Sequence, residues 1–229
     1  MPGCRKDNSA PNGGVTSHDF LSNNKYEKLI VEIQYVTGYP PTATALDNLK
    51  TFLQQRLNKS AGIIIIQNAI SSPGKLFYTL EDIRSIEKAN RTQYTNKKTL
   101  TAYFFFADGE YASNSGNSKV LGITYGSSSM VIFEKTIKDF SGGITQPSAV
   151  TLETTVINHE FGHILGLVNN GSSMQSPHQD EPNGKHCDTK NCLMYYTAET
   201  SDIIANLVGG NIPTLDSKCI DDLRANGGK

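Results

Sequence analysis

Two histidines stand four residues apart in this sequence, and a glutamate directly follows the first of them. The segment reads His159-Glu160-Phe-Gly-His163, and Leu152 and Val156 precede it at helical spacing. Side chains four residues apart on a helix share one face, so both imidazoles can reach a single Zn²⁺ ion. Glu160 would then lie beside the position where a water binds. The spacing therefore predicts a zinc site with Glu160 as general base.

A zinc site of this kind needs a third protein ligand, which must come from elsewhere in the chain. Gly166 follows His163 by three residues, and residues 186–194 read His-Cys-Asp-Thr-Lys-Asn-Cys-Leu-Met. Together these segments resemble the metzincin metallopeptidases, whose pattern is His-Glu-x-x-His-x-x-Gly-x-x-His. The second segment is similar to the His-Cys-x4-Cys-x-Met arrangement of archaemetzincins, and the resemblance covers residues 120–200.

The sequence departs from the metzincin pattern at one ligand. The third histidine of the family would fall at position 169, where this chain has Asn169. An unusual amide ligand, an inactive site, or a third ligand displaced by an insertion would each explain this. The resemblance to archaemetzincins favours the last, with His186 as the ligand and Met194 in the Met-turn beneath the metal.

Other residues compete with His186 for the third position. His178, Asp180 and Glu181 lie inside the insertion and could reach the metal or bind a second cation. A gluzincin-like site would instead use a glutamate on a later helix. Glu199 is followed by Thr-Ser-Asp, one residue short of the Glu-x-x-Ser-Asp spacing typical of that group.

The resemblance also implies a substrate and a reaction. Residues 120–126, Val-Leu-Gly-Ile-Thr-Tyr-Gly, resemble the edge strand that pairs with an extended polypeptide substrate in metzincins. Tyr196 stands where some metzincins place a tyrosine that ligates zinc or stabilises the oxyanion. The implied reaction is peptide-bond hydrolysis, in which Glu160 takes a proton from an activated water and returns it to the leaving amine. The alternative is a degenerate metzincin-like surface protein that binds a polypeptide or glycan, and Asn169 alone supports it.

The elements that must position these residues alternate between strands and helices. This order predicts an α/β (α+β) metzincin-like fold. We expect a mixed twisted sheet with an antiparallel edge strand, packed helices, an active-site helix and a small C-terminal helical subdomain. The expected strands are residues 29–36, 62–70 (buried), 101–107, 120–125 and 130–134, and the expected helices are 42–57, 79–90, one from about 151, 201–208 and 214–225.

The length of 229 residues, 37% of them apolar, suits one domain with a substantial core. Residues 1–25 are polar at their start and are expected to form a flexible tether. Residues 26–229 would be a single catalytic domain, with an upper part 26–168, an insertion loop 167–185 and a lower part 186–229. The insertion is polar and long for a loop without secondary structure, so we expect a lid over the cleft or a cation-binding loop.

Four cysteines bear on the compartment in which the protein works. Cys4 opens a polar stretch that resembles the start of a mature bacterial lipoprotein, although a stray cysteine would look the same. We expect an exported protein, either secreted or a periplasmic or cell-surface lipoprotein attached through a lipidated Cys4. A Cys187–Cys192 disulfide is then expected, with Cys219 as the competing partner. In a cytosolic zinc peptidase the same cysteines would be free thiols or metal ligands.

The overall charge limits the partners that the protein can have. The net charge is −1 and there is no basic stripe, so we expect no nucleic-acid partner. Apolar runs such as residues 63–66 are far too short to cross a bilayer. The expected partner is a polypeptide substrate bound by a monomer with Zn²⁺ as its cofactor.

Overall fold

The computed structural model describes residues 14–116 and 118–229. Its centre is a five-stranded sheet in the order β2-β1-β4-β7-β6, in which only β6 runs antiparallel to its neighbour. The mixed sheet with an antiparallel edge strand is therefore confirmed. The strands are β1 (Lys28–Val36), β2 (Ile63–Ile70), β4 (Thr99–Phe106), β6 (Gly122–Tyr125) and β7 (Ser129–Ile132).

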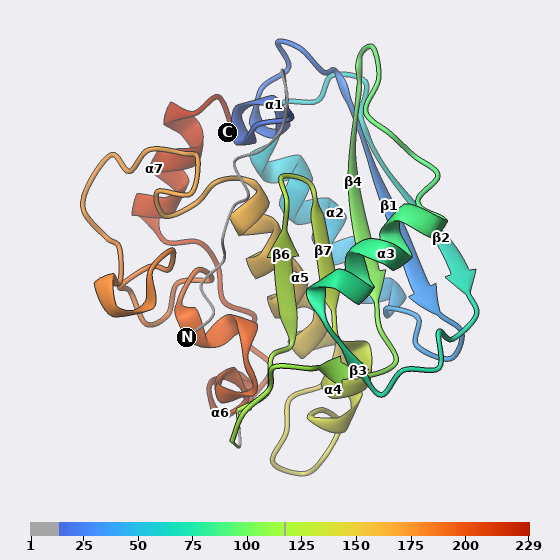
Figure 1. Cartoon of the computed structure of the whole chain (residues 1–229). Helices are drawn as coiled ribbons and strands as arrows, with labels where there is room; N and C mark the ends of the chain where they lie inside the picture. The colour runs from blue at the N-terminus through green and yellow to red at the C-terminus, as the bar shows by residue number, and fades with distance from the viewer. Residues whose placement is uncertain (1–13, 117) are drawn as a thin grey trace.

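Helices cover both faces of this sheet (Figure 1). Helices α2 (Ala43–Arg56) and α5 (Ala149–Ile164) pack on one face, and α3 (Leu80–Asn90) packs on the other. Strand β4 supplies both apolar layers because successive side chains point to opposite faces. Phe104 and Phe106 belong to the layer under α2 and α5, whereas Tyr103 and Phe105 belong to the layer under α3.

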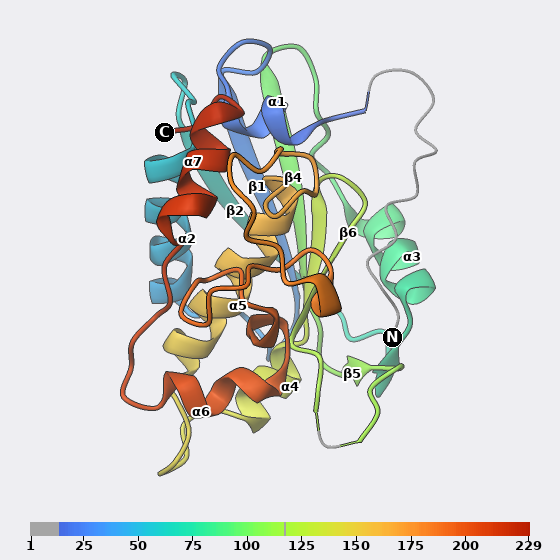
Figure 2. The same cartoon turned by 90° about the vertical axis from the view of Figure 1, so that its left-hand side faces the viewer.

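Helix α5 is the central element of the domain. The Ser148 side chain caps its N-terminus by accepting a hydrogen bond from the Thr151 amide, and every residue from Thr151 to Ile164 is buried. The sheet lies on one side of α5, and the chain that follows the helix covers the other side (Figure 2). A helix buried all round can hold polar side chains only where partners or ligands satisfy them.

The chain after α5 contains short helices joined by ordered turns. These are η1 (Glu181–Asn183), η2 (Tyr196–Glu199), η3 (Ser201–Ile203), α6 (Ile204–Leu207) and α7 (Ser217–Ala225). The expected insertion packs against α7: the Gln175 amide donates to the Asp222 carboxylate at 2.7 Å, and the Asn226 amide donates to the Ser172 hydroxyl at 2.7 Å. The loop is therefore held to the body of the domain along the side nearest α7.

The N-terminal segment differs from its prediction. Helix α1 (Ser17–Leu21) begins with a capping box between Thr16 and Asp19, and both Phe20 and Leu21 are fully buried. The Lys59 ammonium donates to three backbone carbonyls of residues 19–26. A tether extending to residue 25 is therefore wrong, because two apolar side chains anchor this segment in the core. Cys4 lies outside the described residues.

Three other elements were not expected. Strands β3 (Phe77–Tyr78) and β5 (Glu110–Tyr111) form a small separate sheet, and α4 (Glu134–Asp139) begins where a strand was predicted to end. Strand β2 was expected to be buried, but it is an edge strand with Ile64 41% exposed. Within the described residues, no helix is both long and apolar enough to span a bilayer.

Candidate metal centre

Helix α5 presents His159 and His163 one turn apart, with their Nε2 atoms 3.2 Å from each other. Both side chains are buried. The Nδ1 atom of His159 lies 2.7 Å from the Leu193 carbonyl, which can only accept, so Nδ1 carries the proton. The Nε2 lone pair of His159 is therefore free and points toward His163, as in a metal ligand oriented by a backbone carbonyl.

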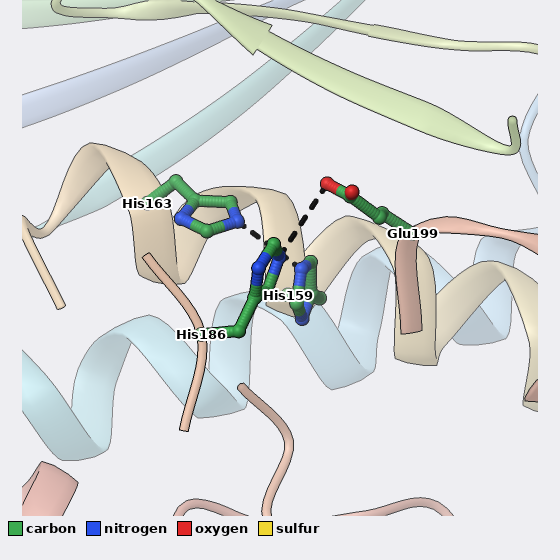
Figure 3. A group of neighbouring side chains, drawn as sticks. All are labelled: His159, His163, His186 and Glu199. Atoms are coloured by element: carbon green, nitrogen blue, oxygen red, sulfur yellow. Dashed lines mark hydrogen bonds and ion pairs between the residues drawn. The ribbon is translucent and has the colours of Figure 1, made fainter. Parts of the chain in front are cut away.

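His186 comes from the turn after η1 and stacks on His159, with ring centroids 5.3 Å apart and an interplanar angle of 12°. Its Nδ1 donates to the Asn183 carbonyl at 2.8 Å, and its Nε2 lies 3.5 Å from the Glu199 carboxylate. Figure 3 shows the three imidazoles and this carboxylate directed toward one another. One ligand atom from each of the four lies within 4.8 Å of the others.

The donor set fits a divalent metal such as zinc. Burial, followed by the charge of His186, lowers the pKa of His159 to about 4, and burial also holds the pKa of His163 well below its usual value. The neutral imidazole is the form that binds zinc. The two facing Nε2 atoms need either a proton shared between them or a cation, since two bare lone pairs would repel each other in a buried space. The arrangement therefore suits an ion held by the three histidines.

Glu160 is fully buried beside this group, and neither carboxylate oxygen has a hydrogen-bond partner among the described residues. Burial raises its pKa to about 8, and the nearby Glu199 carboxylate adds to the shift. Strand β6 crosses directly above it: a Cβ on Gly122 would stand 2.8 Å from the Glu160 Cγ, and the Thr124 hydroxyl donates to the Glu160 carbonyl at 2.7 Å. Only glycine permits this approach.

Met194 lies under α5, fully buried, at the turn between the two histidines. A Cβ on Gly162 would stand 2.3 Å from the Met194 sulfur. Gly166 ends the helix region at φ +80°, where a Cβ would stand 2.6 Å from the Ser172 backbone nitrogen. Met194 and Gly166 therefore both lie close to the histidine group, and the role of Met194 in a Met-turn beneath a metal stays a prediction. The sequence analysis did not identify Gly122 or Gly162. The only sign of a close approach at these positions was a glycine inside a strand or a helix.

The remaining candidates from the sequence lie elsewhere. Asn169 is exposed, with φ +60°, and does not belong to the histidine group. Asp180 and Glu181 are also outside it. Tyr196 begins η2 and its ring packs against Tyr195 at 4.7 Å, so its catalytic role stays a prediction.

A second group of side chains, which we call the thiol cluster, consists of Cys187, Cys192, Asp216 and Cys219. One ligand atom from each lies within 4.8 Å of the others. All three cysteines are free, so the predicted Cys187–Cys192 disulfide is wrong.

The contacts within the thiol cluster bring sulfur atoms and hydrogen-bond donors together. The sulfurs of Cys192 and Cys219 are 3.6 Å apart, and backbone amides of Met194 and Asp216 point at the Cys192 sulfur. Converging sulfurs with amide donors and a carboxylate are typical of a closed metal site. His178, once a rival ligand of the histidine group, lies 3.7 Å from the Cys219 sulfur instead.

Comparisons with known proteins find a similarity in fold but no match in sequence. Neither a known protein family nor a curated protein matches the sequence. Among solved structures, the chain is similar to the crystal structure of archaemetzincin from Methanopyrus kandleri, at 13% identity and a TM-score of 0.53. The match covers 89% of this chain and 96% of that one. The protein therefore has a mixed α/β fold similar to that of archaemetzincin.

Proposed function

We propose that the protein is a zinc-dependent peptidase and that His159, His163 and His186 hold the zinc. The observation that carries this proposal is the convergence of three buried imidazoles, two of them oriented by backbone carbonyls, on one point beside Glu160. A bound zinc ion would polarise the scissile carbonyl and lower the pKa of a water. The fold similarity to archaemetzincin supports the same conclusion.

Glu160 is the proposed general base and then the general acid. Its pKa of about 8 lies near the pH at which such a group must both accept and release a proton. It is held in place from two sides, by α5 and by the Thr124 hydroxyl on β6. Glu160 would therefore accept the proton of the attacking water and deliver it to the leaving amine.

A polypeptide is the proposed substrate because β6 forms an edge of the sheet next to Glu160. An extended peptide can pair with such an edge through main-chain hydrogen bonds. Tyr196, on the next segment, is proposed to stabilise the oxyanion. The alternative, a degenerate binding protein, rests on Asn169 in place of the third histidine. That argument is weaker because His186 lies with His159 and His163. Export and lipidation of Cys4 stay proposals, and the free thiols of the thiol cluster do not support them, because a disulfide was expected in an exported protein.

Zinc content and peptide hydrolysis, measured on the same preparations, test the proposal. Glu160→Gln should keep its zinc and lose at least a hundredfold in turnover of a mixed peptide substrate, since a general base contributes about 10²–10⁴. Glu81→Gln, on the exposed surface of α3, is the matched control. His186→Ala should lower zinc content, whereas Asn169→Ala and His18→Ala should not. Full turnover in Glu160→Gln would refute the mechanism.

A further inference from the structure

Glu199 lies where a fourth protein ligand of the same metal would lie. Two donors bound at about 2.0–2.1 Å to one tetrahedral ion stand about 3.4 Å apart. The Nε2 atoms of His159 and His163 are 3.2 Å apart, and the Nε2 of His186 is 3.5 Å from the Glu199 Oε2. Both pairs match the edge of such a tetrahedron. The Glu199 carboxylate thus lies at a distance from His186 that suits two ligands of one ion (Figure 3).

The backbone holds Glu199 in this position. Its carbonyl accepts a hydrogen bond from the Leu121 amide at 2.8 Å, and the next residue, Thr200, forms an isolated bridge with Val120. The Ser201 amide donates to the Lys119 carbonyl at 2.7 Å. Residues 199–201 are therefore fastened to the chain that leads into β6. The carboxylate is placed by main-chain pairing on a segment separate from those that carry the histidines.

Within the described part of the chain, the positive charge that faces this carboxylate comes from the histidine group itself. The one ion pair of Glu199 there is with His186, and Glu160, a second carboxylate, lies nearby. A proton on the His186 Nε2 can balance Glu199 only while no metal is bound, because a metal ligand must give up that proton. A divalent cation bound by the histidines would then supply the positive charge opposite Glu199 in this largely buried space.

We propose that Glu199 is the fourth ligand of the zinc ion and closes the centre in the resting protein, so that a substrate must displace it. Structural zinc sites use four protein ligands, whereas catalytic sites leave one position open. The Glu199 side chain is 30% exposed, compared with 9% for His186, so it is the ligand best able to move away. This inference rests on the proposed zinc centre and describes its regulation.

Cobalt substitution and chelator competition test Glu199 without reference to turnover. In the wild-type protein, Co²⁺ should give the intense visible bands of a four-coordinate ion. In Glu199→Ala and Glu199→Gln those bands should change, and zinc affinity should fall at least tenfold. Tenfold is the lower bound because the loss of a residue that merely hydrogen-bonds to a metal ligand typically costs about 10–100-fold. Asp202→Ala, an exposed acidic residue on η3, is the matched control and should leave both unchanged. If Glu199→Ala does not fold, the isosteric glutamine variant decides.

Peptide hydrolysis at saturating zinc then tests whether Glu199 closes the fourth position of the metal. The Glu199 variants should cleave peptides faster than the wild type, because the fourth position is open. Unchanged cobalt spectra and zinc affinity, or slower cleavage by folded variants, would overturn the proposal. If no variant and no wild-type preparation cleaves any peptide, the proposed function fails, while the cobalt spectra still decide whether Glu199 is a ligand.

Discussion

The contact between Gly162 and Met194 predicts a specific outcome for Gly162→Ala. Gly162 lies in the turn of α5 between His159 and His163, and a Cβ there would stand 2.3 Å from the Met194 sulfur and 3.5 Å from Leu167 Cδ1. Real Cβ atoms do not approach a sulfur so closely. Met194 is fully buried, so its side chain has little room to retreat. Either the methionine or the helix turn must shift.

The magnitude follows from two opposing effects. Replacing glycine by alanine in a helix interior favours folding by about 1 kcal/mol, whereas overpacking a core costs about 1–3 kcal/mol. In the wild-type background, Gly162→Ala should therefore lower the free energy of unfolding by up to about 2 kcal/mol. With Met194→Ala, which itself costs about 2–5 kcal/mol, the clash is gone and the same change should raise the free energy of unfolding by about 1 kcal/mol.

Urea unfolding of the wild type, both single variants and the double variant measures this difference as a coupling energy of about 1–3 kcal/mol. The measurements should be made with a chelator present, so that metal affinity does not enter. Zinc retention, measured separately, should fall in Gly162→Ala because the shifted turn carries both histidines. If Gly162→Ala stabilises both backgrounds equally, Met194 does not pack against this turn and the reasoning is refuted.

Two other predictions concern buried groups outside the histidine site. Burial raises the pKa of Glu134 to about 10, and the neighbouring Glu153 adds to the shift, so the folded protein keeps a proton that the unfolded chain loses near pH 4.5. The free energy of unfolding should therefore decrease as pH rises from about 5 to 10, by up to about 1.4 kcal/mol per pH unit. In urea titrations at several pH values, Glu134→Gln should show a smaller decrease. An equal decrease in the variant and the wild type would contradict this prediction. In the thiol cluster, zinc should slow the reaction of the cysteines with a thiol reagent, and a chelator should restore that reaction. Cys219→Ser should bind about one zinc ion fewer per chain than the wild type. Equal zinc content in the two proteins would count against a metal in the thiol cluster.

Local patterns predicted much of the fold. Helices α2 and α3 begin at Thr42 and Thr79, whose side chains cap them, and the sequence alone shows both. The spacing of His159 and His163 is also local, because four residues on a helix determine which side chains share a face. The third histidine was reached through resemblance, and the structure brings His186 to the other two.

Features that depend on close approach between distant segments could not be predicted. Gly122 and Gly162 matter because β6 and Met194 lie against α5, which no local pattern reveals. The disulfide prediction failed for the same reason: it paired Cys187 with Cys192 and named Cys219 only as a competing partner, whereas the fold brings all three together with Asp216. The sequence around helix α1 is polar, and the burial of Phe20 and Leu21 against distant segments could not be predicted from it.

The order in which the proposed ligands occur along the chain limits when the proposed centre can form during synthesis. Glu199 follows His159 by 40 residues, and the carbonyl that orients His159 belongs to Leu193. At about 5–20 residues per second, the ribosome adds His159 about 2–8 s before it adds Glu199. During that interval a helix buried in the final structure lacks the segments that will cover it. Metal uptake by all four proposed ligands therefore follows the synthesis of Glu199, and a nascent chain held before that point lacks the segments that cover α5.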